Sequence, residues 1–160
     1  MIRKVTIQDA QAIADIYNVY VQNSVATFET EPVTLQEMCW RIEEISAQYP
    51  YLVYEEDGKI LGYCCAHEWK TRTAYSQTLE TTVYVAVTSQ RKGIGKKLMK
   101  HLIEECRLTG AHALIACITD GNDDSVMLHQ KFGFQQVSHF CQVGKKFGRW
   151  LDVVDFQLLL

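Results

Sequence analysis

The chain has 160 residues, of which 48% are hydrophobic and 22% are charged, and its formal net charge is −3. This length and composition suit one globular domain with a substantial core. The slightly negative charge argues against a general nucleic-acid binder, and no apolar run approaches the ~20 residues that a membrane-spanning helix needs. The N-terminal segment also lacks the apolar stretch of a signal peptide. We therefore expect a cytoplasmic protein with no nucleic-acid or membrane partner.

The first half of the chain predicts a strand, two helices and a β-hairpin. In order, these are a strand at 2–5, a helix after Thr6, a connector at 24–29, a helix from Thr34 that stops before Pro50, and hairpin strands at 51–54 and 60–65. Thr6 with Asp9, and Thr34 with Glu37, have the spacing of helix-opening capping boxes. Asp-Gly at 57–58 favours a tight hairpin turn.

The second half predicts a strand and helix joined by a glycine-containing loop, followed by a further strand, helix and hairpin. In order, these are a polar loop at 67–76, a strand at 79–87, a helix from 94 to about 106, a buried strand at 113–118, a helix from Asn122 to Gly133, and hairpin strands at 134–143 and 150–158. No repeat or linker divides the chain, so we expect one α/β domain over residues 1–160 with a central mixed sheet.

The six cysteines are scattered and form no Cys-x-x-Cys pair. Most of them fall in apolar segments, which favours reduced core residues over disulfides or a structural zinc site. We therefore predict no metal. The residues concerned are Cys39, Cys64, Cys65, Cys106, Cys117 and Cys141.

The loop at residues 90–95 reads Gln-Arg-Lys-Gly-Ile-Gly and joins the end of a strand to the start of an amphipathic helix. Free N–H groups at a helix N-terminus bind anions, and glycines at 93 and 95 would let the backbone approach a phosphate group closely. A Walker loop does not fit, because Lys97 stands where Ser or Thr is required, and Leu98 replaces the third glycine of a dinucleotide fingerprint. A solvated turn remains the alternative.

Gln-x-x-Gly-x-Gly after a strand resembles the pyrophosphate loop of the GCN5-related N-acetyltransferases (GNATs). Six further stretches, in the right order, resemble the phosphinothricin acetyltransferase branch of that family. They are Ala26 to Pro32, Trp69 to Tyr75, Glu80 to Val85, Asn122 to Ser125, Leu128 to Phe134 and Gly148 to Asp152. The resemblance implies the single-domain GNAT fold, with a mostly antiparallel mixed sheet flanked by helices, and a homodimer.

The same resemblance implies acetyl-CoA as co-substrate. Its diphosphate would lie on the loop, and its pantetheine arm would pair with the preceding strand, whose backbone would also stabilise the oxyanion. The cofactor-binding residues so implied are Val83, Tyr84, Val85, Gln90, Arg91, Lys92, Gly93, Ile94, Gly95, Lys96, Asn122 and Ser125.

Two residues are implied as catalytic. An α-amine, with a pKa of about 7.7–8.0, must lose a proton before it attacks a thioester, so a general base helps. Glu80 matches the family's glutamate; the alternative is a solvated strand carboxylate. His129 stands where many relatives place a tyrosine that protonates the departing thiolate, and histidine suits that role near neutral pH. A histidine that merely packs on a helix face is an equal alternative.

The polar loop before Glu80, at residues 67–76, points to an amino-acid-like acceptor. Its donors suit a carboxylate plus a phosphinate, sulfone or sulfoximine oxygen, with arginine binding bidentately. The implied acceptor-binding residues are Phe28, Lys70, Thr71, Arg72, Tyr75, Glu80, Thr81 and Thr82. Alternatives are a peptide N-terminus, a lysine or a polyamine as acceptor, and a CoA-binding module that has lost turnover.

Overall fold

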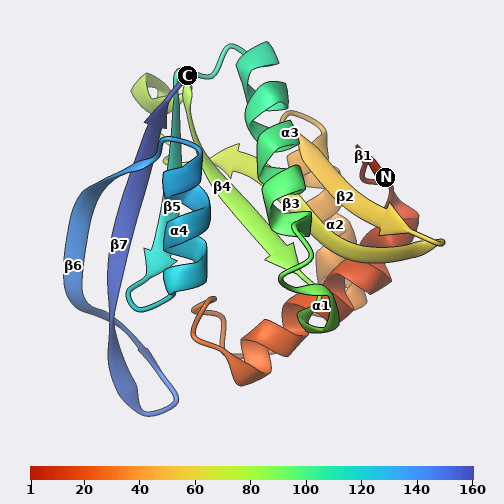
Figure 1. Cartoon of the computed structure of the whole chain (residues 1–160), viewed down its shortest axis with the longest axis horizontal. Helices are drawn as coiled ribbons and strands as arrows, with labels where there is room; N and C mark the ends of the chain where they lie inside the picture. Colours follow the sequence, from red (N-terminus) through yellow and green to blue (C-terminus); the bar gives the residue numbers. More distant parts are fainter.

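A seven-stranded mixed sheet forms the centre of the computed structural model, which describes residues 1–160 (Figure 1). The strand order is β1-β2-β3-β4-β5-β7-β6, and every pairing is antiparallel except that of β4 with β5. The strands are β1 (Ile2–Lys4), β2 (Tyr51–Glu56), β3 (Lys59–Glu68), β4 (Thr78–Val85), β5 (Ala113–Thr119), β6 (Gln135–Lys146) and β7 (Arg149–Leu159).

Four helices cover the two faces of this sheet. They are α1 (Ala10–Asn23), α2 (Leu35–Ser46), α3 (Ile94–Leu108) and α4 (Asp123–Lys131). One core cluster lies under α3, where Leu98 and Leu102 meet Leu52 of β2. A second cluster lies under α1 and α2, where Ile13 meets Val53. Neighbouring residues of β2 thus enter opposite cores, as the two-residue period of a strand requires.

The helix starts expected from the sequence are confirmed. The Thr6 backbone N–H donates to Asp9 Oδ2 (2.8 Å), and the Glu37 N–H donates to Thr34 Oγ1 (3.2 Å). The Ser125 N–H donates to Asn122 Oδ1 (3.3 Å). Each contact spans only three residues, which is why the amino-acid sequence alone predicts it.

The feature that creates the candidate site is the separation of β4 from β5. The two strands pair only where residues 78–80 face residues 113–115. Just beyond these pairs, the Thr81 hydroxyl donates to the Ile115 carbonyl oxygen (3.3 Å). Figure 1 shows the strands side by side at one end and apart at the other. Beyond residue 80, the edge of β4 therefore faces a gap instead of a neighbouring strand.

Several expectations need correction. Instead of running to residue 87, β4 ends at Val85 and is followed by a 3₁₀ turn at Val87–Ser89. The strands of the final hairpin run on to Lys146 and from Arg149, so that only two residues form its turn. Cys117 and Cys141 are exposed, whereas Cys64, Cys65 and Cys106 are buried; all six cysteines are free. No helix has the length and apolar character of a membrane span.

Candidate active site

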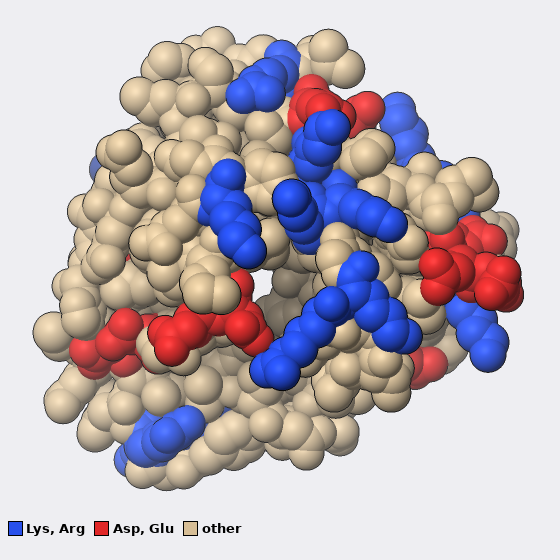
Figure 2. Space-filling model, viewed as in Figure 1, with Lys and Arg blue, Asp and Glu red and all other residues tan.

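A cleft of about 840 Å³ opens where β4 and β5 separate. Figure 2 shows a hollow in this face of the molecule, with Lys and Arg side chains gathered along one side of it. Most of the predicted site residues line the cleft and are thus brought together. They are Phe28, Glu80, Thr81, Thr82, Val83, Tyr84, Val85, Gln90, Arg91, Gly93, Ile94, Gly95, Lys96, Asn122, Ser125 and His129.

The glycine loop presents a row of free backbone donors at the start of α3. Arg91 and Gly93 have φ angles of 61° and 78°, in the left-handed region, and this reverses the chain before the helix begins. The Lys97 N–H makes the first helical hydrogen bond, to the Gly93 carbonyl oxygen (3.1 Å), while the N–H groups of residues 91–96 donate to no other group of the protein. Because these donors sit at the positive end of the helix dipole, the loop suits an anionic group.

Tyr20 of α1 fastens this loop to the end of β4. Its hydroxyl donates to the Val85 carbonyl oxygen (2.5 Å) and accepts a hydrogen bond from the Gln90 side-chain amide (2.8 Å). The predicted Gln90 therefore holds the loop in place through its side chain. The sequence gives no sign of this role for Tyr20, because its two partners lie more than 60 residues away along the chain.

Glu80 is a half-buried carboxylate on β4, at the last residue that pairs with β5. Its cross-strand neighbour on β3 is His67, and Cys117 of β5 faces it across the cleft. Removal from solvent raises the pKa of Glu80 above its ordinary value, an effect that His67 and Cys117 oppose and Asp155 adds to. A carboxylate with a raised pKa is a stronger base than a solvated one. Sequence reasoning missed His67, Cys117 and Asp155, because strand pairing alone brings them near Glu80.

His129 lies on the inner face of α4 and is only 5% exposed. Its Nδ1–H donates to the Ser125 carbonyl oxygen (2.8 Å), and its ring packs edge-on against Phe134 with a centroid distance of 5.0 Å. Burial lowers the pKa of the imidazole, partly opposed by the hydrogen bond to Ser125. These contacts favour a neutral ring whose Nε2 carries no proton, so His129 must take up a proton before it can donate one.

The connector between α1 and α2 is fixed against the final hairpin and forms one wall of the cleft. Lys146 of β6 is buried, and its Nζ donates to the carbonyl oxygens of Ser24 (2.7 Å) and Thr27 (2.8 Å). The ring of Phe28 rests on Gly144, where an added Cβ would lie only 2.2 Å from a ring carbon. Gly144 and Lys146 thus position Phe28, a role that no local pattern in the sequence indicates.

The basic loop that the sequence assigned to the acceptor does not reach the cleft of its own chain. No residue from 68 to 79 lines the cleft. Lys70 instead lies over the Trp69 ring (4.2 Å to the centroid), and Tyr75 packs edge-on against the same ring (5.2 Å). The predicted residues that stay outside the cleft are Lys70, Thr71, Arg72, Tyr75 and, in the glycine loop, Lys92.

A mixed sheet split between β4 and β5, with a glycine loop at the helix that follows β4, defines an acyltransferase-type cleft. Residues 2–154 match the acetyltransferase (GNAT) domain family, and the chain belongs to it.

Its relatives include the phosphinothricin N-acetyltransferase of Streptomyces viridochromogenes, 40% identical over 98% of this chain and 85% of the relative. The L-methionine sulfoximine/L-methionine sulfone acetyltransferase of Salmonella typhimurium is 39% identical over 95% of this chain and 90% of the relative. A Sinorhizobium meliloti phosphinothricin acetyltransferase, solved in complex with acetyl-CoA, superposes with a TM-score of 0.97 at 35% identity, over 100% of this chain and 88% of that one.

Proposed function

We propose that the protein transfers an acetyl group from acetyl-CoA to the α-amine of a small amino-acid-like acceptor of the phosphinothricin, methionine sulfone or methionine sulfoximine type. The observation that carries the proposal is the placement of Glu80. This half-buried carboxylate with a raised pKa shares one cleft with the free N–H groups of the glycine loop. The relatives' activities support the same acceptor class.

The residues of the cleft fit acetyl-CoA. Its diphosphate suits the N–H groups of residues 91–96, with Arg91 and Lys96 supplying positive charge at the cleft wall. The edge of β4 at residues 83–85 has no neighbouring strand and suits the amides of the pantetheine arm, with the Val85 carbonyl oxygen already accepting one hydrogen bond from Tyr20. The Asn122 side-chain oxygen already caps α4, so its amide NH₂ is the group left to donate. When bound, acetyl-CoA supplies an acetyl group activated as a thioester.

Glu80 takes the proton that the acceptor's ammonium group must lose, directly or through one water. Neither cysteine of the cleft is suited to carry the acetyl group. Burial raises the pKa of Cys65 to about 12. Cys117 is exposed to the open cleft, but the protein atoms packed around its thiol, followed by the charges of Glu80 and Asp155, raise the pKa of Cys117 as well. Both thiols stay protonated near neutral pH, and a thiol in that state is a poor nucleophile. This supports direct transfer to the amine.

We propose that His129 takes up a proton from solvent at Nε2 and donates it from that atom to the departing thiolate. Since a thiolate leaves readily by itself, His129→Gln should lower kcat less than any loss of Glu80 does, and it should leave acceptor binding intact. The lowered pKa of His129 predicts that wild-type kcat falls as pH rises through a value below 6.5. Steady-state pH profiles should show this limb in the wild type and lose it in the variant. Wild-type kcat in a fully folded variant would leave His129 with a packing role only.

Arg72 is proposed to recognise the acceptor's anionic group. Because the loop does not line the cleft of its own chain, a homodimer, which we also propose, would let the loop of one subunit approach the cleft of the other. Arg72→Ala should then raise the acceptor KM about tenfold or more with little change in kcat, since charge-assisted hydrogen bonds are worth ~1.5–3 kcal/mol. Sedimentation would test the dimer, and Lys59→Ala, at an exposed hairpin end, is the matched control.

An acceptor screen with acetyl-CoA, following release of the free CoA thiol, tests the whole proposal. Phosphinothricin, methionine sulfone and methionine sulfoximine should exceed spermidine and a histone-like peptide in kcat/KM. Plain methionine should be poor, because donors arranged for the oxo group would be left unpaired. A higher kcat/KM for spermidine or for the peptide would overturn the proposed acceptor class, but not the use of acetyl-CoA. Binding of acetyl-CoA without turnover of any amine would favour a CoA-binding module. We also propose that the protein acts in the cytoplasm.

A further inference from the structure

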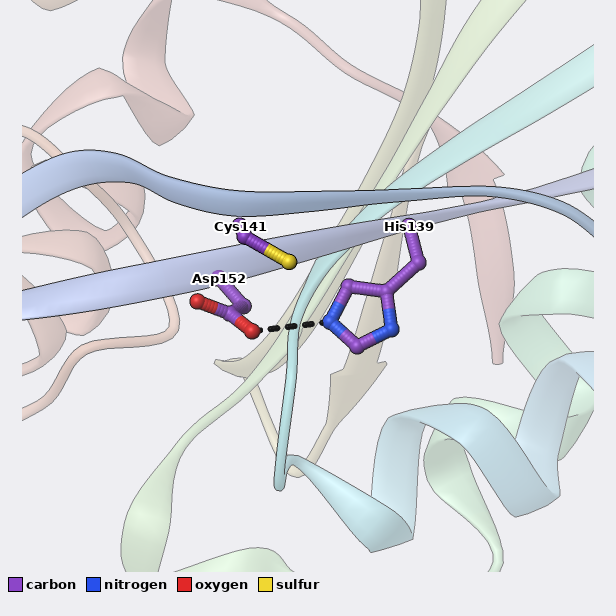
Figure 3. Close-up of side chains that lie close together, drawn as sticks. All are labelled: His139, Cys141 and Asp152. Atoms are coloured by element: carbon purple, nitrogen blue, oxygen red, sulfur yellow. Dashed lines mark hydrogen bonds and ion pairs between the residues drawn. The ribbon is translucent and has the colours of Figure 1, made fainter.

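Outside the cleft, three side chains with metal-binding atoms converge on the hairpin of β6 and β7 (Figure 3). The residues are His139 and Cys141 of β6 and Asp152 of β7, and one donor atom from each lies within 4.8 Å of those of the other two. None of the three lines the acetyltransfer cleft. They carry a nitrogen, a sulfur and an oxygen donor, and this mixture suits Zn²⁺ better than Mg²⁺ or Ca²⁺, which prefer oxygen alone.

Strand pairing brings the three residues together, and a β-bulge lies beside them. Phe140 pairs with Val153 and Gly144 pairs with Leu151, so three residues of β6, at 141–143, stand opposite Asp152 alone. Gln142 takes a φ of 53°, in the left-handed region, and its N–H donates to Asp152 Oδ1 (2.8 Å). Residues 139 and 141 are two apart on β6, and a strand directs such residues to the same face. The bulge contributes the Gln142 N–H, which holds the Asp152 carboxylate in a fixed orientation.

The hydrogen bonds of His139 and Asp152 resemble those that support metal ligands in proteins. His139 Nε2 lies 2.8 Å from Asp152 Oδ2, while Asp152 Oδ1 is held by the backbone, which is how ligating carboxylates are usually supported. In Figure 3, Nε2 is the ring nitrogen nearer both Asp152 and Cys141, and the other ring nitrogen points away. A Cys-His-Asp catalytic triad would need one ring nitrogen for each partner, so the arrangement fits metal coordination instead.

We propose that Cys141 Sγ, His139 Nε2 and Asp152 Oδ2 bind one Zn²⁺ ion per chain, with water as the fourth ligand. Tetrahedral zinc places its ligand atoms about 3.3–3.8 Å apart, by simple geometry from the usual bond lengths. The histidine and carboxylate atoms must therefore separate slightly, and the sulfur must move inward by about 1 Å at most. All three side chains are at least partly exposed, so these shifts cost little and the ion has open access. On binding, the Cys141 thiol releases its proton to solvent, and His139 gives up the Nε2 proton that it donates to Asp152, so that the neutral ring carries its proton on Nδ1.

Titration of the reduced, full-length protein with Zn²⁺ and with Co²⁺ tests the site. We expect one ion per chain, a sulfur-to-cobalt charge-transfer band in the near ultraviolet, and a rise in the thermal midpoint with added Zn²⁺. Cys141→Ser should abolish the band, and both Cys141→Ser and His139→Gln should weaken Zn²⁺ binding at least tenfold, about 1.4 kcal/mol.

Cys39→Ser and His101→Gln are the matched controls, since each makes the same substitution at a position outside the cluster, and both should bind as the wild type does. Retention of folding by each variant is checked by circular dichroism. If Cys141→Ser keeps the cobalt band, or if the wild type binds no Zn²⁺, the proposal is overturned and His139–Asp152 is an ordinary surface ion pair.

Discussion

Glu80→Gln should lower kcat by roughly 10²–10⁴, which is the loss typical of removing a general base. The amide keeps the size of the side chain and its place on β4, but it cannot take the amine's proton. Acetyl-CoA affinity should persist, because the glycine loop is untouched. Steady-state kinetics together with calorimetric titration of acetyl-CoA separate the two effects.

The pH dependence gives a second readout of the same residue. Glu80 works only when it is deprotonated, and its folded-state pKa is raised above the ordinary value of 4.5. Wild-type kcat should therefore rise with pH through an inflection above 4.5, and the glutamine variant should lose this limb.

Glu68→Gln, at the exposed end of β3 and outside the cleft, is the matched control and should keep wild-type kcat. A loss at Glu80 smaller than about tenfold, combined with a raised acceptor KM, would mean that Glu80 only orients the amine.

Gly95→Val should weaken acetyl-CoA binding at least tenfold, about 1.4 kcal/mol. Gly95 lies in the first turn of α3, where a Cβ would point between Leu128 and Val85 at ordinary contact distances of 3.6 and 3.7 Å. The fold therefore tolerates an added Cβ here. The branched valine, however, adds bulk beside the free N–H groups that are expected to receive the diphosphate.

Gly95→Ala is the graded control, since it adds only the Cβ and should lose less affinity than valine does. Gly93→Val should weaken binding as well, but its φ of 78° strains any side chain, so its thermal midpoint must be measured in parallel. Unchanged affinity in Gly95→Val, with the variant folded, would remove the cofactor assignment from this loop.

The features of this protein that could be predicted from its sequence are those that depend on local interactions. The order of the elements followed from hydrophobic periodicity, and the helix starts at Thr6, Thr34 and Asn122 followed from contacts between residues three apart. The anion-binding character of the glycine loop also depends on local structure, because free N–H groups occur wherever a helix begins without side-chain caps. The resemblance of short motifs then predicted the family, which is confirmed, and the role that we propose for Glu80.

Only the tertiary structure decided the surroundings of those residues. The cleft exists because β4 and β5 separate after residue 80, and the register of strands distant in the sequence brings Cys117 to face Glu80. His129 is buried against Phe134, which lowers its pKa, whereas the loop around Arg72 lies outside the cleft. Burial and strand register depend on contacts between residues far apart in the chain, so a sequence read through local patterns determines which side chains are available, and the packed fold determines their protonation, exposure and neighbours.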